Sequence, residues 1–495
     1  MKKNYIRVLY VLVLVTATSC IDDLTSLNKN PKAYQSGTIA GGPFFSNATR
    51  NYVDLLCYPN GGMTLKILAQ QFAETTYFDA SSYNLPNVGN GFWVISYRDV
   101  LNDYKEAKRI IGETPGLYAG VDKNQLAIIE LMEVFVYSNL VNTYGDIPYS
   151  GAVSTSLKNE ALDADNLTPA YDNAAAIYDD LFVRLNNALA NLDPNTDAGG
   201  GNVGFGTADI VFHDDVAAWV KFGNVLKLRM GMTLSDVNPT KAKSVVESIS
   251  ASNLFTSNND NAVLEFFTAT PNTNQIWVNI IQSEREDFVA SNTMIDLMKA
   301  PVVDDPRIPL FYTEDNVGGY SGGIYGRSNS YVTYSKAGGT MTETDFPGTL
   351  LDYAEQEFLL AEAAARGFTV AGTAQTHYNN GVLASIDYWG GDAVAAAAYL
   401  ADPAVAYTTA LGGTPLNRIA RQKYIALFNR GLEAWTEYRR LDYPVFNVPP
   451  VTNGDFPIRY TYPNSEQTAN GENYTAAAAA IGGDVVTNKV WWDTK

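Results

Sequence analysis

The strongest constraint on the fold of this 495-residue chain is a helical repeat of apolar residues in several long segments. Large apolar side chains recur there every three or four positions, so a helix would carry them on one face and could bury them. The clearest examples are residues 124–142, 215–235, 350–365 and 417–439, and a shorter one covers 242–249. The pattern predicts a mostly α fold.

Helix starts and connections can also be read from the sequence. Thr168 followed by Pro169 predicts the start of a further helix. A threonine side chain can cap the first turn, and proline is tolerated at the first helical position. The predicted helices come in pairs with short connections, which favours stacked helix hairpins of the tetratricopeptide kind. No clean repeat of about 34 residues is present, so periodicity alone leaves that architecture open.

Long irregular segments separate the predicted helices. Residues 78–92, 191–213, 301–347 and 449–488 are rich in Gly, Asn, Asp, Pro and Tyr. Loops of this length are usually functional or are structured by their own side chains. No linker divides two kinds of composition after residue 40. We therefore expect one domain, residues 41–495, in which a helical scaffold carries elaborate loops.

The N-terminal segment has the features of an export signal. Basic residues precede a short apolar run at 8–15, which is far below the roughly 18 residues of a membrane span. Residues 1–19 are therefore predicted to be a signal peptide. Small residues stand directly before Cys20, as in the lipobox of bacterial lipoproteins, which predicts lipidation of Cys20. A plain signal-peptidase site with a chance cysteine is the alternative. Residues 20–40 would form the lipidated end and a surface tether.

Charge and rare residues exclude several classes of partner. The formal net charge is −19, so DNA, RNA and anionic lipid surfaces are unfavourable partners. Without Cys20 the chain keeps only Cys57, which can form no internal disulfide and is expected to be a small buried apolar residue. The two histidines, His213 and His377, are too few for a multi-histidine metal site.

Three short motifs could carry chemistry, but each lacks a feature that the chemistry requires. The Gly-rich run 199–206 lacks the Lys and Ser/Thr of a phosphate-binding loop, so a flexible loop is expected. The oxygen-rich run 258–261 lacks the spacing of a calcium loop and predicts a capped turn. The acidic run 284–287 predicts a solvated face, because neighbouring carboxylates would point in different directions. No serine elbow, HExxH or CxxC motif is present. No catalytic residue, metal or cofactor is predicted, and a carboxylate pair assembled only by the fold stays open.

Aromatic residues are the most notable feature of the loops. The chain has 31 tyrosines. Aromatic faces can bury the apolar face of a sugar or of a peptide side chain, while nearby polar groups bond its rim. Alternatively, the rings pack the loops onto the scaffold, and the helical spacing of Trp93 and Tyr97 suggests that one of these two is core. The candidate ligand contacts are Tyr77, Tyr83, Trp93, Tyr320 and Tyr325, and Tyr331 and Tyr334 lie in the same loop as the last two.

Several segments, taken in order along the chain, resemble one known family. The sequence is similar to the SusD/RagB family of outer-membrane nutrient-binding lipoproteins, in its SusD-like branch. Each segment is a weak signal alone, but together they span nearly the whole chain. They are Cys20, YGDIPY at 144–149, DPRIP at 305–309, YAEQEFLLAEA at 353–363, YNNG at 378–381, RQKYIALF at 421–428, the helix 433–440, residues 462–474 with Tyr462, Pro463, Asn473 and Tyr474, and KVWWD at 489–493.

The resemblance implies a fold, a partner and a function. The fold would be an α-rich scaffold of tetratricopeptide-like helix pairs with a long-loop ligand-binding face. The protein would be a lipid-anchored cell-surface protein of the outer membrane. It would bind an oligosaccharide and deliver it to a TonB-dependent, SusC-like transporter, and it would not be an enzyme. Alternatives are an oligopeptide-binding lid of the same kind of importer, a surface glycosidase or peptidase, and a structural adhesin.

The resemblance does not fix the ligand contacts, and the five candidate rings are assigned by loop position only. Charged residues in the matching C-terminal helix have a different expected role. Trp435 and Arg439 are four residues apart and share a helix face, which predicts stacking or a buried ion pair. We interpret Glu433, Arg439 and Arg440 as structural ties.

Overall fold

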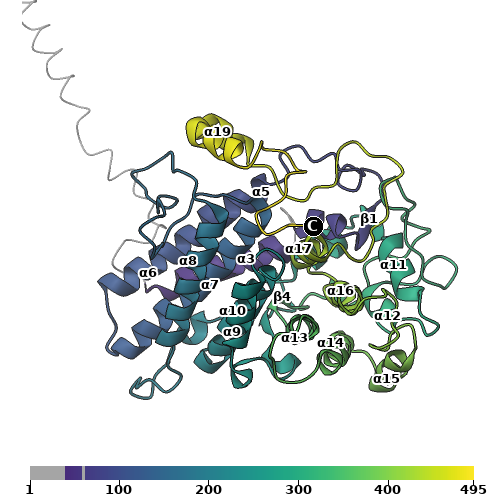
Figure 1. Ribbon diagram of the computed structural model, residues 1–495, viewed down its shortest axis with the longest axis horizontal. Coiled ribbons are helices and arrows are strands. Elements are labelled where there is room, and N and C mark those ends of the chain that lie inside the picture. The colour runs from purple at the N-terminus through teal and green to yellow at the C-terminus, as the bar shows by residue number, and fades with distance from the viewer. Residues whose placement is uncertain (1–39, 58–61) are drawn as a thin grey trace, which may run out of the picture. The chain divides into compact units, whose positions relative to one another are not determined.

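Helices dominate the computed structural model, which describes residues 40–57 and 62–495 (Figure 1). The predicted signal peptide 1–19, Cys20 and the tether up to residue 39 lie outside the described residues. The first half contains α3 (Gly42–Cys57), α4 (Gly62–Leu68), α5 (Asn90–Val94), α6 (Asn102–Glu113), α7 (Ala119–Tyr144), α8 (Ala174–Asn191), α9 (Val216–Thr233) and α10 (Pro239–Glu247). The second half contains α11 (Asn292–Lys299), α12 (Ile308–Phe311), α13 (Tyr353–Ala365), α14 (Ala374–Tyr388), α15 (Ala393–Ala401), α16 (Pro415–Ala426), α17 (Gly431–Leu441), α18 (Asn464–Ala469) and α19 (Gly471–Ala480).

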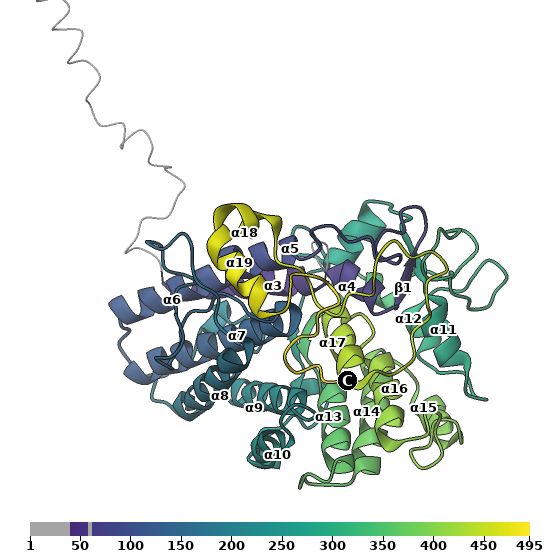
Figure 2. The same cartoon turned by 45° about the horizontal axis from the view of Figure 1, so that its top comes forward.

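Consecutive helices pack as pairs, as predicted. Helix α7 packs against α8, α9 against α10, α13 against α14, and α16 against α17. Figure 1 and Figure 2 show α6, α7 and α8 side by side in one half of the molecule and α13, α14 and α16 side by side in the other half. Residues Gly41–Lys495 form one compact unit. The paired helices therefore make the scaffold from which the loops extend.

Helix α7 is long and apolar enough to cross a membrane by length and composition alone. However, 89% of its apolar window is buried inside the protein. Two of its polar side chains are also bonded inside the protein: the Asn139 side chain donates to the Tyr52 hydroxyl at 2.8 Å, and Trp492 donates to Asn142 Oδ1 at 2.9 Å. Helix α7 is therefore the central core helix of the scaffold.

Several predicted helix boundaries are wrong, and two of them have a clear structural cause. Helix α8 starts at Ala174, with Asn173 rather than Thr168 as its cap, because Asp172 first forms a bridge with Ile147 that keeps the chain extended. The predicted helix 417–439 is broken between α16 and α17, where Asn429 adopts a φ of +68°. The turn brings Gly431 so close to α4 that an added Cβ would lie 2.5 Å from the Lys66 backbone nitrogen. A tertiary contact thus overrides the apolar periodicity.

The strands are short and tie loops together. Strand β1 (Phe72–Glu74) pairs antiparallel with β3 (Phe288–Ala290), and β2 (Ala262–Leu264) pairs antiparallel with β4 (Gly348–Leu351). In the first pair Phe72 stands opposite Ala290 and Glu74 opposite Phe288. The described residues also contain two π-helices, η1 (Ile95–Leu101) and η5 (Trp277–Gln282), and four short 3₁₀ turns, η2 (Gly206–Ala208), η3 (Ala251–Asn253), η4 (Asn258–Asp260) and η6 (Thr340–Thr342).

The minor sequence motifs have structural roles. The Gly-rich run is a loop, and the Asp214 carboxylate organises it by accepting from the backbone nitrogens of Val203, Gly204 and Gly206. Ser257 caps η4, so the capped turn predicted for 258–261 is confirmed. Residues 284–286 are exposed to solvent, as expected. Cys57 is free and buried, as predicted.

A network of buried ion pairs joins α9, α13, α16 and α17. Arg229 Nε lies 2.6 Å from Glu355 Oε1, and Arg430 Nη1 lies 2.8 Å from Asp352 Oδ2. Arg440 donates to Glu362 at 2.6 Å through Nη1. Each of these side chains is at most about a tenth exposed. We call this set, with Glu433, Lys423 and Glu437, the ion network.

The ion network confirms the structural interpretation of the C-terminal motif. The Arg439 guanidinium carbon lies 3.6 Å from the centroid of the Trp435 ring, which is the predicted stacking. Arg439 also donates to the backbone oxygen of Asn142 at 2.9 Å. Burial would raise the pKa of Glu355, but Arg229 and Arg430 hold it well below its usual value. These charges therefore serve to fix helices to one another.

Candidate ligand-binding face

Three loops meet around the β1–β3 pair. The backbone nitrogen of Thr75 donates to Asp287 O at 2.9 Å, and the Thr75 hydroxyl donates to Glu286 O at 2.6 Å. The backbone nitrogen of Asn329 donates to Thr75 O at 2.9 Å. Asn329 Nδ2 also donates to Glu74 O at 2.9 Å. Main-chain groups of the segments 75–77, 286–288 and 327–331 are thereby held in one place.

A fourth segment, from the C-terminal part of the chain, packs on the same loops. The backbone nitrogen of Asn453 donates to Ser82 O at 2.7 Å. An added Cβ on Gly454 would lie 2.4 Å from Tyr83 O, and one on Gly326 would lie 2.3 Å from the Pro449 side chain. Glycine at these two positions allows the loops to approach closely. Figure 1 shows the resulting crowding of loops on the side of β1 and α11, and we call this region the loop face.

Tyr77 is the most exposed aromatic ring of the loop face. Its side chain is 77% exposed and stands two residues after Thr75, at the junction just described. Tyr331 stands two residues after Asn329, on the facing loop, and is half-buried. Lys336 Nζ lies 4.9 Å from the centroid of the Tyr331 ring, which fixes that ring by a cation–π contact. We call Tyr77 and Tyr331 the tyrosine platform.

The platform has polar groups at its edge. Burial and the nearby Glu286 carboxylate raise the pKa of Tyr331, so its hydroxyl is a neutral hydrogen-bonding group at physiological pH. Thr76, Arg327 and Ser330 are exposed on the same segments. An exposed ring with neutral hydroxyls and a polar rim suits a ligand that has one apolar face and many hydroxyl groups.

Tyr83 and Tyr325 support the loop face from below. Their ring centroids are 6.3 Å apart, and Tyr83 also meets Phe456 edge-on at 5.4 Å. Tyr83 has a φ of +64°, a conformation that is uncommon outside glycine and is concentrated at functional sites. Burial raises the pKa of Tyr83 to about 12. Tyr325 is 1% exposed, whereas Tyr83 and Tyr320 are half-buried at the edge of the loops.

Trp93 lies apart from these rings, in an aromatic cluster of the core. It is only 6% exposed and meets Tyr97 at 4.9 Å, Tyr144 at 5.0 Å and Tyr462 at 6.0 Å. The structure therefore does not bring the five candidate rings together. Burial of Trp93 and Tyr325 argues against direct ligand contact by either ring, and contact by Tyr77, Tyr83 and Tyr320 stays a prediction.

One exposed aromatic ring, Phe267, is not among the five candidate ligand contacts. Phe267 is 61% exposed just beyond β2, whereas its neighbour Phe266 is 5% exposed. Alternation of adjacent side chains about an extended segment places one in the core and the other in solvent. The Thr, Pro and Asn residues that follow Phe267 are the sequence signal for an exposed turn. Phe267 lies outside the tyrosine platform and is therefore a suitable control for it.

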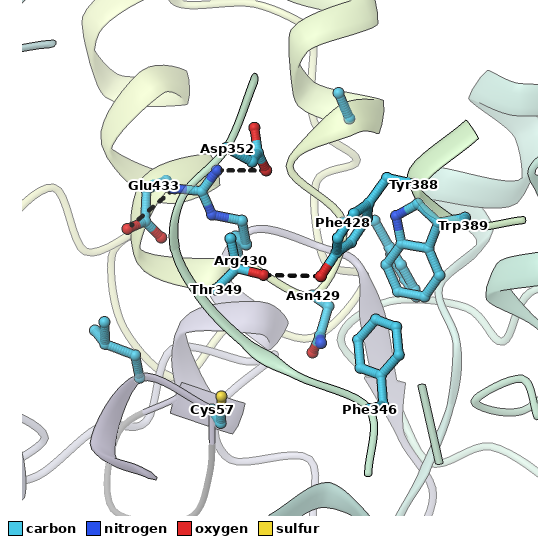
Figure 3. A pocket seen from close by; sticks show the side chains of 12 residues that line it. Cys57, Phe346, Thr349, Asp352, Tyr388, Trp389, Phe428, Asn429, Arg430 and Glu433 are labelled. Atoms are coloured by element: carbon cyan, nitrogen blue, oxygen red, sulfur yellow. Dashed lines mark hydrogen bonds and ion pairs between the residues drawn. The ribbon is translucent and has the colours of Figure 1, made fainter. Parts of the chain in front are cut away.

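A small internal cavity lies beside the ion network (Figure 3). Arg430 stands between Asp352 and Glu433 on one wall, and the rings of Phe346, Trp389 and Phe428 form the other. The cavity measures about 20 Å³, which is room for roughly one water molecule. Its size excludes a nutrient ligand. In the part of the chain that the structure describes, no group of three or more His, Cys, Asp or Glu side chains is arranged to hold a metal ion.

The chain has clear similarity to known proteins. A SusD-like family, described as "Starch-binding associating with outer membrane", matches residues 31–463. A chitin-binding SusD homologue from Flavobacterium johnsoniae is 26% identical, with a TM-score of 0.76 over 92% of this chain and 98% of that one. A SusD homologue from Bacteroides uniformis is 25% identical, with a TM-score of 0.78 over 92% and 99%. A SusD homologue from Bacteroides thetaiotaomicron is 24% identical, with a TM-score of 0.75 over 92% and 99%. No curated protein sequence matches at a significant level. The structural matches confirm the predicted fold class.

Proposed function

The chain belongs to the SusD-like family of the SusD/RagB proteins, and from this premise we propose that it is a cell-surface lipoprotein that binds an oligosaccharide and delivers it to a SusC-like, TonB-dependent transporter of the outer membrane. The family description names starch binding, and one similar structure is described as a chitin-binding protein. Both ligands are neutral glycans. In this proposal the protein binds the oligosaccharide and does not change it chemically.

The observation that carries the proposal is the tyrosine platform. Tyr77 exposes a large ring face to solvent, where a ligand can reach it. The loops beneath it are joined by main-chain hydrogen bonds, so little ordering entropy is lost when a ligand binds. Aromatic stacking against the apolar face of a sugar, with hydrogen bonds from the rim, is the expected mode of recognition.

The net charge of −19 is consistent with a neutral ligand. Such a charge disfavours acidic polysaccharides, because like charges repel at the distances of a binding encounter, and it places no such penalty on uncharged ones. One cation beside the platform, Lys336, is engaged over the Tyr331 ring. We therefore place starch-type and chitin-type oligosaccharides first among the ligands to be tried.

The test compares the tyrosine platform with a matched exposed ring. Wild type, the double variant Tyr77→Ala/Tyr331→Ala and the control Phe267→Ala would be titrated calorimetrically with maltoheptaose and with chitohexaose. We expect one glycan to bind wild type and Phe267→Ala equally, and to bind the double variant at least tenfold more weakly, since each stacked ring contributes about 1 kcal/mol. Equal binding by all three proteins would contradict a role of the tyrosine platform in glycan binding.

Product analysis and a peptide arm separate the alternative functions. The same glycans would be incubated with wild-type protein and examined for shortened chains by mass spectrometry. Intact glycans are expected, and cleavage would establish a glycosidase instead. Binding of a mixed oligopeptide pool, with no binding of either glycan, would favour the alternative that this protein is the oligopeptide-binding lid of an importer. Co-purification of a barrel protein from outer membranes tests the proposed transporter partner.

A further inference from the structure

A larger cavity lies at the other end of the molecule from the loop face. It measures about 370 Å³, within the range of about 300–1,000 Å³ that is typical of small-molecule sites. Helices α6 and α7 form its floor, and the loop 150–163 forms its outer wall. Figure 1 and Figure 2 both show α6 and α7 far from β1 and α11. Its lining includes Lys105, Lys108, Glu133, Tyr137, Ser150, Leu162 and Asp163.

The wall of this cavity is fixed before any ligand arrives. The Asp180 carboxylate accepts from the backbone nitrogen of Ser154 at 2.7 Å and from the Tyr149 hydroxyl at 2.9 Å. Asp172 accepts from the backbone nitrogen of Lys158 at 2.8 Å. The Ser150 hydroxyl accepts from the backbone nitrogen of Leu162 at 2.9 Å. A site that is held open in this way loses little entropy on binding.

The charges around the cavity are balanced. Lys108 Nζ lies 2.7 Å from Glu130 and 2.9 Å from Glu133, and Arg184 pairs with the same two carboxylates. Lys105 donates to the Leu162 backbone oxygen, beside Asp163. Two cations thus face two carboxylates at the base, and Lys105 and Asp163 add one charge of each sign at the rim. The site offers no net positive charge to an anion, and it offers both donors and acceptors to a neutral ligand.

Tyr137 supplies an unused polar group at this site. Its side chain is 1% exposed, and its ring is held against Tyr149 at 4.7 Å. Its hydroxyl faces the Ser150 backbone without making a hydrogen bond of good geometry. A buried hydroxyl without a partner is unfavourable, and a ligand that supplies the partner recovers that free energy. Lys108 likewise has three donors and uses two of them on carboxylates.

We propose that this cavity is a second binding site, which takes one or two units of a neutral, hydroxyl-rich sugar. The Tyr137 hydroxyl, the third Lys108 N–H and the Asp163 carboxylate form hydrogen bonds with the sugar hydroxyls. The inference stands on the cavity and does not require a glycan to bind at the tyrosine platform.

The test removes the Tyr137 hydroxyl and keeps its ring. Wild type, Tyr137→Phe and Tyr460→Phe would be titrated with glucose, maltose, N-acetylglucosamine and chitobiose, using ligand-observed NMR, and with inorganic phosphate as an anionic comparison. Tyr460 is the matched control, because it is a buried tyrosine whose hydroxyl also lacks a hydrogen bond and it packs against Trp435, outside the cavity. We expect one of the sugars to bind about five- to tenfold more weakly to Tyr137→Phe, with the control and the melting temperatures unchanged.

A cavity-filling variant and the platform variant complete the test. Leu162→Trp should abolish the same binding, because Leu162 lines the cavity and the indole would occupy it. Tyr77→Ala/Tyr331→Ala should leave it intact, so failure of the proposed function and failure of this inference give different results. The inference is overturned if sugar binding survives both Tyr137→Phe and Leu162→Trp, if only the platform variant loses it, or if phosphate binds and no sugar does.

Discussion

The ion network and the loop face of this protein are both crowded with polar groups, but they use them in opposite ways. In the ion network, Arg229, Arg430 and Arg440 are buried with carboxylate partners from other helices. In the loop face, main-chain hydrogen bonds hold the loops and Tyr77 is left in solvent. Buried pairs fix helices at a desolvation cost, whereas exposed rings contribute little to stability and are available to a ligand. Substitutions in the two regions should therefore affect different measurements.

The largest effect is expected from Arg440→Ala. The change leaves Glu362 and Glu437 buried without their common partner, and breaking a buried pair typically costs about 3–5 kcal/mol of unfolding free energy. Chemical denaturation would measure the loss. Arg109→Ala, which removes an exposed arginine with two glutamate partners on α6, is the matched control and should change stability little. Equal effects of the two changes would contradict a structural role for the ion network.

Trp93→Ala should lower stability by about 3 kcal/mol, because it leaves a cavity among Tyr97, Tyr144 and Tyr462. Glycan affinity, measured well below the melting temperature, should stay within twofold of wild type. Thermal melting and calorimetric titration of the same preparation give both values. Weaker glycan binding at an unchanged melting temperature would instead indicate that Trp93 contacts the ligand directly.

Stability should also fall in acid, and Glu362 should account for part of the fall. Burial would raise the pKa of Glu362, but Arg440 and Arg366 lower it from 4.5 to about 2. A carboxyl group with a lowered pKa stabilises the folded state above its unfolded pKa, and that stability is lost as the pH falls through the folded pKa. The melting temperature should therefore decrease between pH 4.5 and pH 2. Glu362→Gln should be less stable at pH 7 and should show a shallower decrease, and a parallel curve would argue against this assignment.

The smallest effect is expected from Tyr77→Phe. The ring face remains and only the hydroxyl is lost, so glycan affinity should fall about two- to threefold. Tyr77→Ala should weaken binding more, by about five- to tenfold, without a change in melting temperature. Fluorescence titration of both variants would reveal whether ring stacking or the hydroxyl dominates. If Tyr77→Phe weakened glycan binding as much as Tyr77→Ala does, the proposal that the ring binds by stacking would be wrong.

The two regions also differ in how far the sequence predicted them. Apolar periodicity located the scaffold helices, and the spacing of Trp435 and Arg439 predicted their stacking. The break at Asn429 was missed because close packing of Gly431 against α4 causes it, and a local pattern does not contain that contact. Exposure of individual rings was harder still. Tyr77 and Trp93 flank the same Gly- and Asn-rich stretch, 78–92, and only the fold decides which of them is buried.

The cavity below the loop 150–163 shows the same limit. Lys108 and Asp163 are more than fifty positions apart in the chain, and carboxylates of three different segments fold the loop that brings them together. No short motif records such an arrangement. By contrast, many weak segments in order along the chain were enough to predict the family, because the family similarity covers residues 31–463.

A crystal structure of the protein with the glycan that binds it most tightly tests the central claim most directly. The account predicts an intact oligosaccharide with sugar faces stacked on Tyr77 and Tyr331, and a scaffold whose buried ion pairs are unchanged. A shortened product, or a glycan found only at sites where both of these rings remain in solvent, would contradict it.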